Sequence, residues 1–125
     1  MHKTLVVTAT ITSCLAASAH AQVKRTPIQT IDFPPGFTTI TAIFEIAPGT
    51  CAGRHTHPGI ETSYLLEGEA TLKVAGQPDQ VIKAGDSFHI AAGTPHDACP
   101  TPGHGVKGLG TFVVEKGKPL ATPAP

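Results

Sequence analysis

Alternating apolar and polar residues predict β-strands along most of the chain. In the run 39–47 every second residue is apolar, with threonine or glutamate at most of the positions between. Successive side chains of a strand point to opposite faces of a sheet, so this alternation predicts a strand with one buried face. Shorter strand-like runs lie at 62–66, 70–74, 80–83, 87–90 and 106–115.

Glycine and proline separate these runs. Pro48-Gly49 ends the first, and similar turn residues follow the later ones. Gly108 and Gly110 interrupt the last run and indicate a bend or a close approach of two backbones. Long stretches with helical periodicity are absent. Many short strands joined by turns predict an all-β sandwich or barrel, because such strands are too short for a parallel α/β fold.

The N-terminus has the organisation of a secretory signal peptide over residues 1–21. A short charged start and a short apolar stretch lead to the small-residue site Ala19-His20-Ala21. The apolar stretch is too short to cross a bilayer. We therefore expect cleavage after Ala21, a periplasmic or secreted protein, and no membrane span after cleavage. Two alternatives stay open: a segment that is never cleaved, and lipidation at Cys14, which ends a lipobox-like sequence.

Charge and length restrict the partners and the number of domains. The chain has 9 Lys and Arg against 9 Asp and Glu, a formal net charge of 0, and no basic run. We therefore expect no nucleic-acid partner. Residues 22–125 have the length of one small domain, which buries roughly two-thirds of the surface that its unfolded chain exposes.

The triplet His55-Thr56-His57 is the most informative local pattern. On a strand its two histidines project from the same face and can share one metal ion, whereas on a helix they would point to nearly opposite sides. Glu61 follows four residues later, and His96 lies downstream, just past Gly93. Three imidazoles and one carboxylate suit Mn, Fe, Ni, Cu or Zn. The plainer alternative is histidines that serve packing or solubility.

The surrounding residues carry a resemblance to a known family. One block holds Gly49, the histidine triplet, Glu61 and Gly68, and the second holds Gly85-Asp86 and the segment 93–96. Together these blocks resemble the two motifs of the cupin superfamily, and the resemblance extends over about residues 39–114.

The resemblance implies a single antiparallel jelly-roll barrel, also described as a double-stranded β-helix. The barrel would occupy residues 38–115, after an N-terminal arm at 22–37 and before a Pro- and Ala-rich irregular tail at 116–125. It would hold one divalent transition metal ion at its mouth. The ligands implied by the motif are His55, His57, Glu61 and His96.

The cysteines that remain after signal cleavage are Cys51 and Cys99. In an exported protein they are compatible with a disulfide or with two small buried thiols. In cupins the strands that carry the two motifs are antiparallel neighbours. Cys51 precedes His55 by four residues, and Cys99 follows His96 by three. The resemblance therefore implies a Cys51–Cys99 disulfide beside the metal site.

Three further residues could contribute to such a site. His89 could face either the cavity or the solvent, and it is a weak candidate for a general base. His104 lies in a Pro/Gly loop, where we expect it to be solvated. Arg54 precedes the first ligand and could meet an anionic substrate, although exposure at the rim is the plainer expectation.

The resemblance supports one main function and two alternatives. The main expectation is an exported metalloenzyme that acts on a small molecule as a dioxygenase, isomerase or decarboxylase. The first alternative is a non-catalytic periplasmic protein that binds a metal or small ligand. The second is a metal-free epimerase-like cupin, against which the complete ligand set argues. Cupins are commonly dimers built through edge strands, so a homodimer is also implied.

Overall fold

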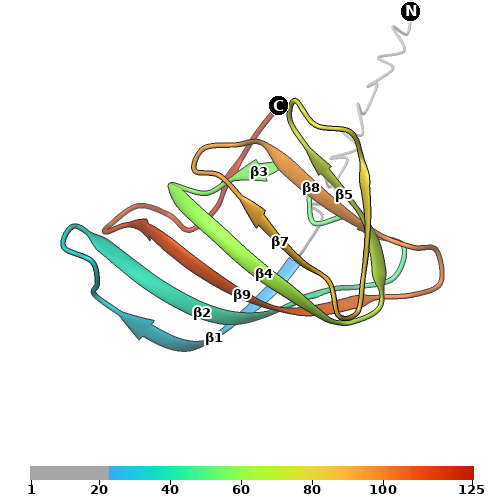
Figure 1. The fold of residues 1–125 in the computed structure, drawn as a ribbon, viewed down its shortest axis with the longest axis horizontal. Helices are drawn as coiled ribbons and strands as arrows, with labels where there is room; N and C mark the ends of the chain where they lie inside the picture. The colour runs from blue at the N-terminus through green and yellow to red at the C-terminus, as the bar shows by residue number, and fades with distance from the viewer. Residues whose placement is uncertain (1–22) are drawn as a thin grey trace, which may run out of the picture.

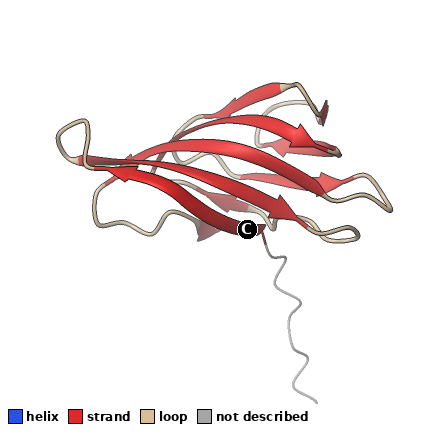
Figure 2. Ribbon diagram, turned by 90° about the horizontal axis from the view of Figure 1, so that it is seen from below, coloured by secondary structure: helices blue, strands red, loops and turns tan. Residues whose placement is uncertain are grey.

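The computed structural model describes residues 23–125, and every regular element in that range is a β-strand (Figure 2). The strands form two five-stranded antiparallel sheets. The expected signal peptide and the alternative lipidation at Cys14 lie outside the described residues. Between residues 23 and 125, no helix has the length and apolar character needed to cross a membrane.

The first sheet, which we call the long-strand sheet, has the order β1-β2-β9-β4-β7. Its members lie side by side in Figure 1 as a broad twisted layer. Four of its five strands are nine or ten residues long. Their bounds are β1 Val23–Ile31, β2 Phe37–Ile46, β9 Val106–Glu115, β4 Gly59–Glu67 and β7 Ser87–Ile90.

The second sheet, the short-strand sheet, has the order β10-β3-β8-β5-β6. Its longest member has six residues, and two members have only two. Their bounds are β10 Thr122–Pro123, β3 His55–Thr56, β8 His96–Pro100, β5 Glu69–Val74 and β6 Gln80–Lys83.

The core lies between the two sheets. It combines side chains of the long-strand sheet, such as Phe44 and Leu65, with Leu72 of the short-strand sheet. Burying each such side chain contributes about 1.5–3 kcal/mol. Gly108 also faces this core, where an added Cβ would overlap the ring of Phe44. The interruption of the last predicted strand is therefore a close approach that only glycine permits.

The all-β prediction is confirmed, and so are the six strands expected from alternation. β6, β7 and β9 have the predicted bounds, whereas β4 begins three residues earlier than expected. β1 was not predicted, because Lys24 and Arg25 break the apolar alternation and Pro27 is unusual within a strand. The register of β1 against β2 shifts between Pro27 and Gln29. The segment expected as an arm thus supplies an edge strand.

The Cys51–Cys99 disulfide is present. It joins the loop before β3 to β8, with the two Cα atoms 4.2 Å apart. The adjacent backbone is also joined, since the Ala52 amide donates to the Ala98 carbonyl at 2.8 Å. The pairing implied by the family resemblance is confirmed.

Candidate metal centre

Three buried histidines meet where β3 pairs with the start of β8. His55 on β3 pairs directly with His96 on β8, and His57 follows two residues after His55. All three are buried, with at most 8% of each residue exposed. One ring nitrogen from each lies within 4.8 Å of the others, so the cluster could hold a metal ion. The prediction that the triplet places both histidines on one face is confirmed.

Backbone carbonyls fix the protonation of these rings. The Nδ1 atoms of His55, His57 and His96 lie 2.6, 2.6 and 2.9 Å from the carbonyl oxygens of Gly53, Leu120 and Thr94. A carbonyl oxygen only accepts a hydrogen bond, so each Nδ1 carries the proton. In a neutral imidazole the other nitrogen, Nε2, then has a free lone pair. This arrangement orients histidines for metal ligation.

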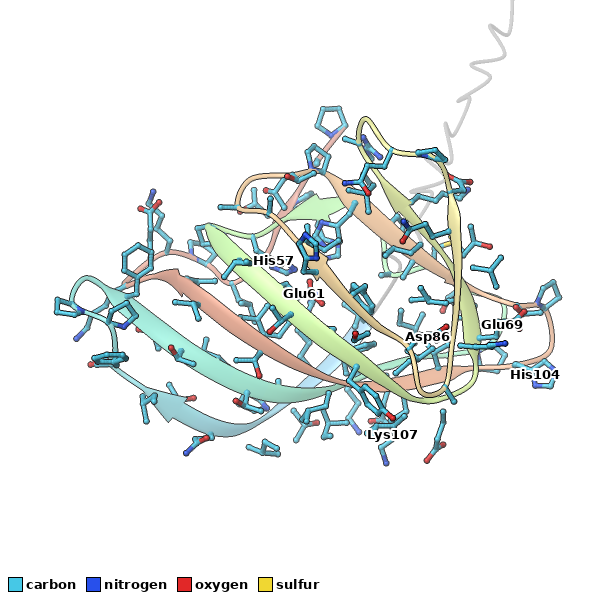
Figure 3. The ribbon with its side chains drawn as sticks, in the orientation of Figure 1. His57, Glu61, Glu69, Asp86, His104 and Lys107 are labelled. Atoms are coloured by element: carbon cyan, nitrogen blue, oxygen red, sulfur yellow. A yellow bond between two sulfur atoms is a disulfide. The ribbon has the colours of Figure 1, made fainter. Side chains whose placement is uncertain are left out.

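Glu61 is the one member of the predicted set that comes from the long-strand sheet. Its Oε2 lies 3.0 Å from His57 Nε2 and 3.5 Å from His96 Nε2. Ser63 donates a hydrogen bond of 2.6 Å to Oε1 and thereby fixes the carboxylate. Figure 3 shows Glu61 and His57 facing one another between the sheets. The structure therefore places Glu61 beside His57 and His96, next to the cluster of three histidines that could hold a metal ion.

The contact between Glu61 and His57 is close but unsatisfied. Oε2 is 3.0 Å away, yet His57 Nε2 is a buried atom without a hydrogen-bond partner. A nitrogen lone pair beside a carboxylate oxygen is a repulsive pair of acceptors. A cation between them, either a proton on Nε2 or a metal ion, would remove the repulsion, and the donor set suits a divalent transition metal.

The protonation states also favour metal binding. Burial raises the pKa of Glu61, but hydrogen bonds from the His57 and His96 rings, in the form that carries a proton on Nε2, and from the Ser63 hydroxyl outweigh it and hold the pKa below its ordinary value. Burial lowers the pKa of His55 to about 4, against a smaller opposing effect of the Gly53 carbonyl. At neutral pH the cluster therefore offers a carboxylate anion and a neutral His55.

Two contacts of this cluster were not predicted. Arg25 on β1 places Nη2 3.1 Å from His55 Nε2. The carbonyl of Leu120, in the segment expected to be irregular, accepts from His57, and the tail then forms β10 against β3. A charged residue directed inward and a backbone acceptor leave no pattern in a sequence, so neither could be found from motif spacing.

The three further candidates lie away from the cluster. His89 is exposed on the outer face of the long-strand sheet, opposite exposed Thr62, so it is not a general base for this centre. His104 is exposed near the far end of the molecule (Figure 3). The Arg54 Nε donates to the Pro125 carbonyl at 2.7 Å in an exposed position.

Comparison with known proteins gives a family and a fold. The family model of the cupin domain matches residues 42–104, which include all four predicted ligands. Over 60 residues the chain is 45% identical to the HTH-type transcriptional regulator PuuR of Escherichia coli (strain K12), a match that covers 46% of this chain. It covers only 32% of the regulator, so this chain spans about a third of that relative's length.

Solved structures with the same fold include an enzyme. DMSP lyase DddQ from Ruegeria pomeroyi DSS-3 superposes with a TM-score of 0.71 at 19% identity, covering 90% of this chain and 56% of that one. A cupin-like protein from Thermotoga maritima gives 0.67 at 20% identity, covering 82% and 75%. Identities this low establish the shared jelly-roll fold alone.

Proposed function

The chain belongs to the cupin domain family, and on that premise we propose that it is an exported metalloenzyme acting on a small molecule. One divalent transition metal would be held by His55, His57, Glu61 and His96. The observation that carries this proposal is the shared orientation of the histidines. Each Nδ1 is tied to a backbone carbonyl, which leaves three Nε2 lone pairs for a cation beside a buried carboxylate.

The protein residues would prepare this centre for chemistry. The bound metal would supply Lewis acidity or a place for O₂ and substrate. Ser63 holds Oε1 of Glu61, so Oε2 is the carboxylate atom free to bind the metal or to accept a proton. Four protein ligands leave room on an octahedral ion for a small molecule. This supports dioxygenase, isomerase or decarboxylase chemistry, and the fold of DddQ adds lyase chemistry to the reactions worth screening.

The size of the site favours a second candidate. The cavity beside the histidines is partly open to solvent and has a volume of about 30 Å³, so that only a very small ligand, or one end of a larger one, fits inside it. A site this small also suits a non-catalytic periplasmic protein that binds a metal or a very small ligand. Turnover of a substrate distinguishes the enzyme from this alternative.

Export and dimerisation belong to the same proposal. The Cys51–Cys99 disulfide supports an oxidising compartment, as expected of a periplasmic or secreted protein. Exposed Ile28 and Ile31 lie on the edge strand β1, which supports a homodimer built through that edge. Sequencing the N-terminus of the exported protein tests cleavage after Ala21. Light scattering of wild type and Ile28→Glu tests the dimer, which that variant is expected to dissociate.

Metal analysis tests the centre directly. Protein produced in the periplasm should contain about one equivalent of Mn, Fe, Ni, Cu or Zn. His57→Ala should lose it, because the ion binds the folded state through this ring. The matched control is His104→Ala, which removes an exposed histidine outside the cluster and should keep the metal. Metal-free wild type, or unchanged metal in His57→Ala, would contradict the proposal. Loaded protein is then screened for O₂ uptake with phenols, keto acids and sugars, and for cleavage of DMSP.

A further inference from the structure

The cavity beside the metal centre is lined by a polar group of residues and a larger apolar set. The polar group consists of Arg25, His55, Glu61 and His96. The apolar lining comes from both sheets and includes Val23, Phe44, Ile46, Leu72, Phe88 and Phe112. A ligand that fits this division has one polar group and an otherwise apolar body.

Arg25 reaches this cavity because it takes an inward position on a strand. Val23 and Arg25 pair with Ile46 and Phe44 of β2, whose side chains are buried in the core. Lys24, between them, points to the outer face, where its exposed side chain lies 3.5 Å from Glu45. Turning a guanidinium inward costs free energy unless the charge is paired and its N–H groups are bonded.

The pairing of Arg25 is incomplete. Its Nη2 donates to His55 Nε2, its Nε is buried without a partner, and its guanidinium carbon lies 6.0 Å from the centre of the Phe112 ring. Within residues 23–125, none of the ion pairs includes Arg25. The Glu61 carboxylate lines the same cavity and its charge acts on Arg25, but the two form no ion pair. This partly buried cation beside a cavity thus retains N–H groups for a further acceptor.

The contact with His55 links Arg25 to the metal. His55 Nδ1 is bonded to the Gly53 carbonyl, so Nε2 has a single lone pair. That lone pair can accept from Arg25 or bind a metal, but it cannot do both. Metal binding through His55 would therefore release the Nη2 group of Arg25 to a ligand in the cavity.

We propose that Arg25 anchors the carboxylate of a small, otherwise apolar acid, which it holds beside the metal centre. This inference rests on the proposed function of the same site and names its substrate class. A planar carboxylate matches the fork of a guanidinium and can accept two parallel hydrogen bonds. The apolar walls select a short hydrocarbon body. Arg54 does not serve this role, because it is exposed and donates to the Pro125 carbonyl.

Calorimetric titration of the zinc-loaded protein tests the anchor. The probes are acetate, propionate and butyrate, each paired with its neutral amide, together with inorganic phosphate, all at constant ionic strength. We expect the carboxylates to bind wild type at least tenfold more tightly than the amides or phosphate. Arg25→Met should lose about tenfold in carboxylate affinity, as expected for one charged hydrogen-bonded contact. Arg25→Lys keeps the charge but loses the forked guanidinium, so its carboxylate affinity should lie between those of wild type and Arg25→Met.

The matched control is Lys24→Met. It removes one positive charge from the neighbouring residue of the same strand and should leave carboxylate affinity unchanged. Arg25→Met should also bind Zn²⁺ more tightly than wild type, by up to about tenfold, because no guanidinium competes for His55 Nε2. Equal butyrate affinity in wild type and Arg25→Met, or equal loss in Lys24→Met, would overturn the anchor.

Zinc content measured on the same samples separates this inference from the metal proposal. Stoichiometric zinc with butyrate binding that ignores Arg25 overturns the anchor and leaves the metal centre standing. Butyrate binding that needs Arg25 in a protein that takes up no zinc overturns the metal centre and supports the anchor. If Arg25→Met fails to fold, the comparison of Arg25→Lys with wild type decides, and identical affinities overturn the anchor.

Discussion

The two sheets of this jelly roll are stabilised in different ways. In the long-strand sheet, β2 and β9 pair over ten consecutive positions. In the short-strand sheet, β3 and β8 share a single paired position, His55 opposite His96. His55 and His96 come from this second sheet and His57 directly follows β3, whereas Glu61 comes from the first sheet. Most of the candidate metal centre therefore lies where the hydrogen-bond ladder is shortest.

Other contacts replace the ladder around the histidines. The Cys51–Cys99 disulfide and the bond from Ala52 to Ala98 fix the chain before β3. The tail strand β10 covers the other side of β3. A site on short strands can thus be held by a few separate contacts, each removable by itself, while the long-strand sheet is expected to stay folded.

Removing the disulfide should have the largest effect. The bond closes a loop with a sequence separation of 48 residues, so Cys51→Ala with Cys99→Ala should lower the free energy of unfolding by about 4 kcal/mol. Urea denaturation measures the loss. Hydrogen exchange should show faster opening of β3 and β8 than of β2 and β9. Uniformly faster exchange in both sheets would contradict the division between them.

Acidification should destabilise the metal-free protein by a smaller amount. Burial lowers the pKa of His55 to about 4, against about 6.5 in an unfolded chain. Between these values the unfolded state binds more protons. The stabilising contribution of neutral His55 is therefore fully present above about pH 6.5. It is lost as the pH falls through 4, which lowers the free energy of unfolding by on the order of 2 kcal/mol.

Urea unfolding between pH 7 and pH 4 measures the slope of the free energy of unfolding against pH. Variants then show which residue causes this slope. His55→Gln should flatten the slope, whereas His104→Gln in the exposed loop should leave it unchanged. The lowered pKa of Glu61 adds its own loss at more acidic pH, so the comparison with His55→Gln is needed. A slope that survives in His55→Gln would show that His55 is not its source.

Removing the tail should weaken metal binding about tenfold, or about 1.4 kcal/mol. A chain that ends at Pro119 lacks the Leu120 carbonyl that accepts from His57 Nδ1, and outer hydrogen bonds of this kind tune metal affinity. Competition with a zinc indicator measures the change. Leu120→Ala keeps the carbonyl and is the matched control. Equal weakening by both variants would assign the effect to packing of the side chain.

The smallest effect is expected in the long-strand sheet. Thr111→Ala removes a hydroxyl contact with Thr41, whose two Oγ1 atoms are 3.5 Å apart. The loss should be about 0.5 kcal/mol or less, as for surface substitutions. Metal affinity should not change. A measurable loss of metal in Thr111→Ala would show that the two sheets are more tightly coupled than their contacts indicate.

The sequence predicted the parts of the fold in which side chains alternate. Ile40 to Ile46 alternate because one face of β2 is buried, and the turns are glycine- and proline-rich. β1 escaped prediction because Arg25 occupies an inward position that the pattern reserves for apolar residues. β10 escaped because two residues are too few to show a period. β3 and β8 are also too short or irregular to show alternation, and they were expected only as the strands that carry the histidine motifs.

The candidate site was likewise predicted only where side-chain type carries a pattern. His55, His57, Glu61 and His96 were found because their spacing matches a motif, and the structure places the carboxylate beside the cluster of three histidines. Arg25 and the Leu120 carbonyl were missed, although both contact these histidines. The first depends on the orientation of a strand that was not predicted. The second is a main-chain atom, for which residue identity carries no signal.

The position of β1 has a practical consequence for handling the protein. This strand begins at Val23, two residues after the expected cleavage point at Ala21, and it supplies both Val23 and Arg25 to the cavity. A retained leader or an N-terminal purification tag would continue directly from a strand that lines the site. Ligand screens are therefore best done on protein with the N-terminus expected after cleavage and without a tag at either end, since the C-terminal strand β10 pairs with β3. Because this strand lines the cavity, the state of the N-terminus is expected to affect ligand affinity directly.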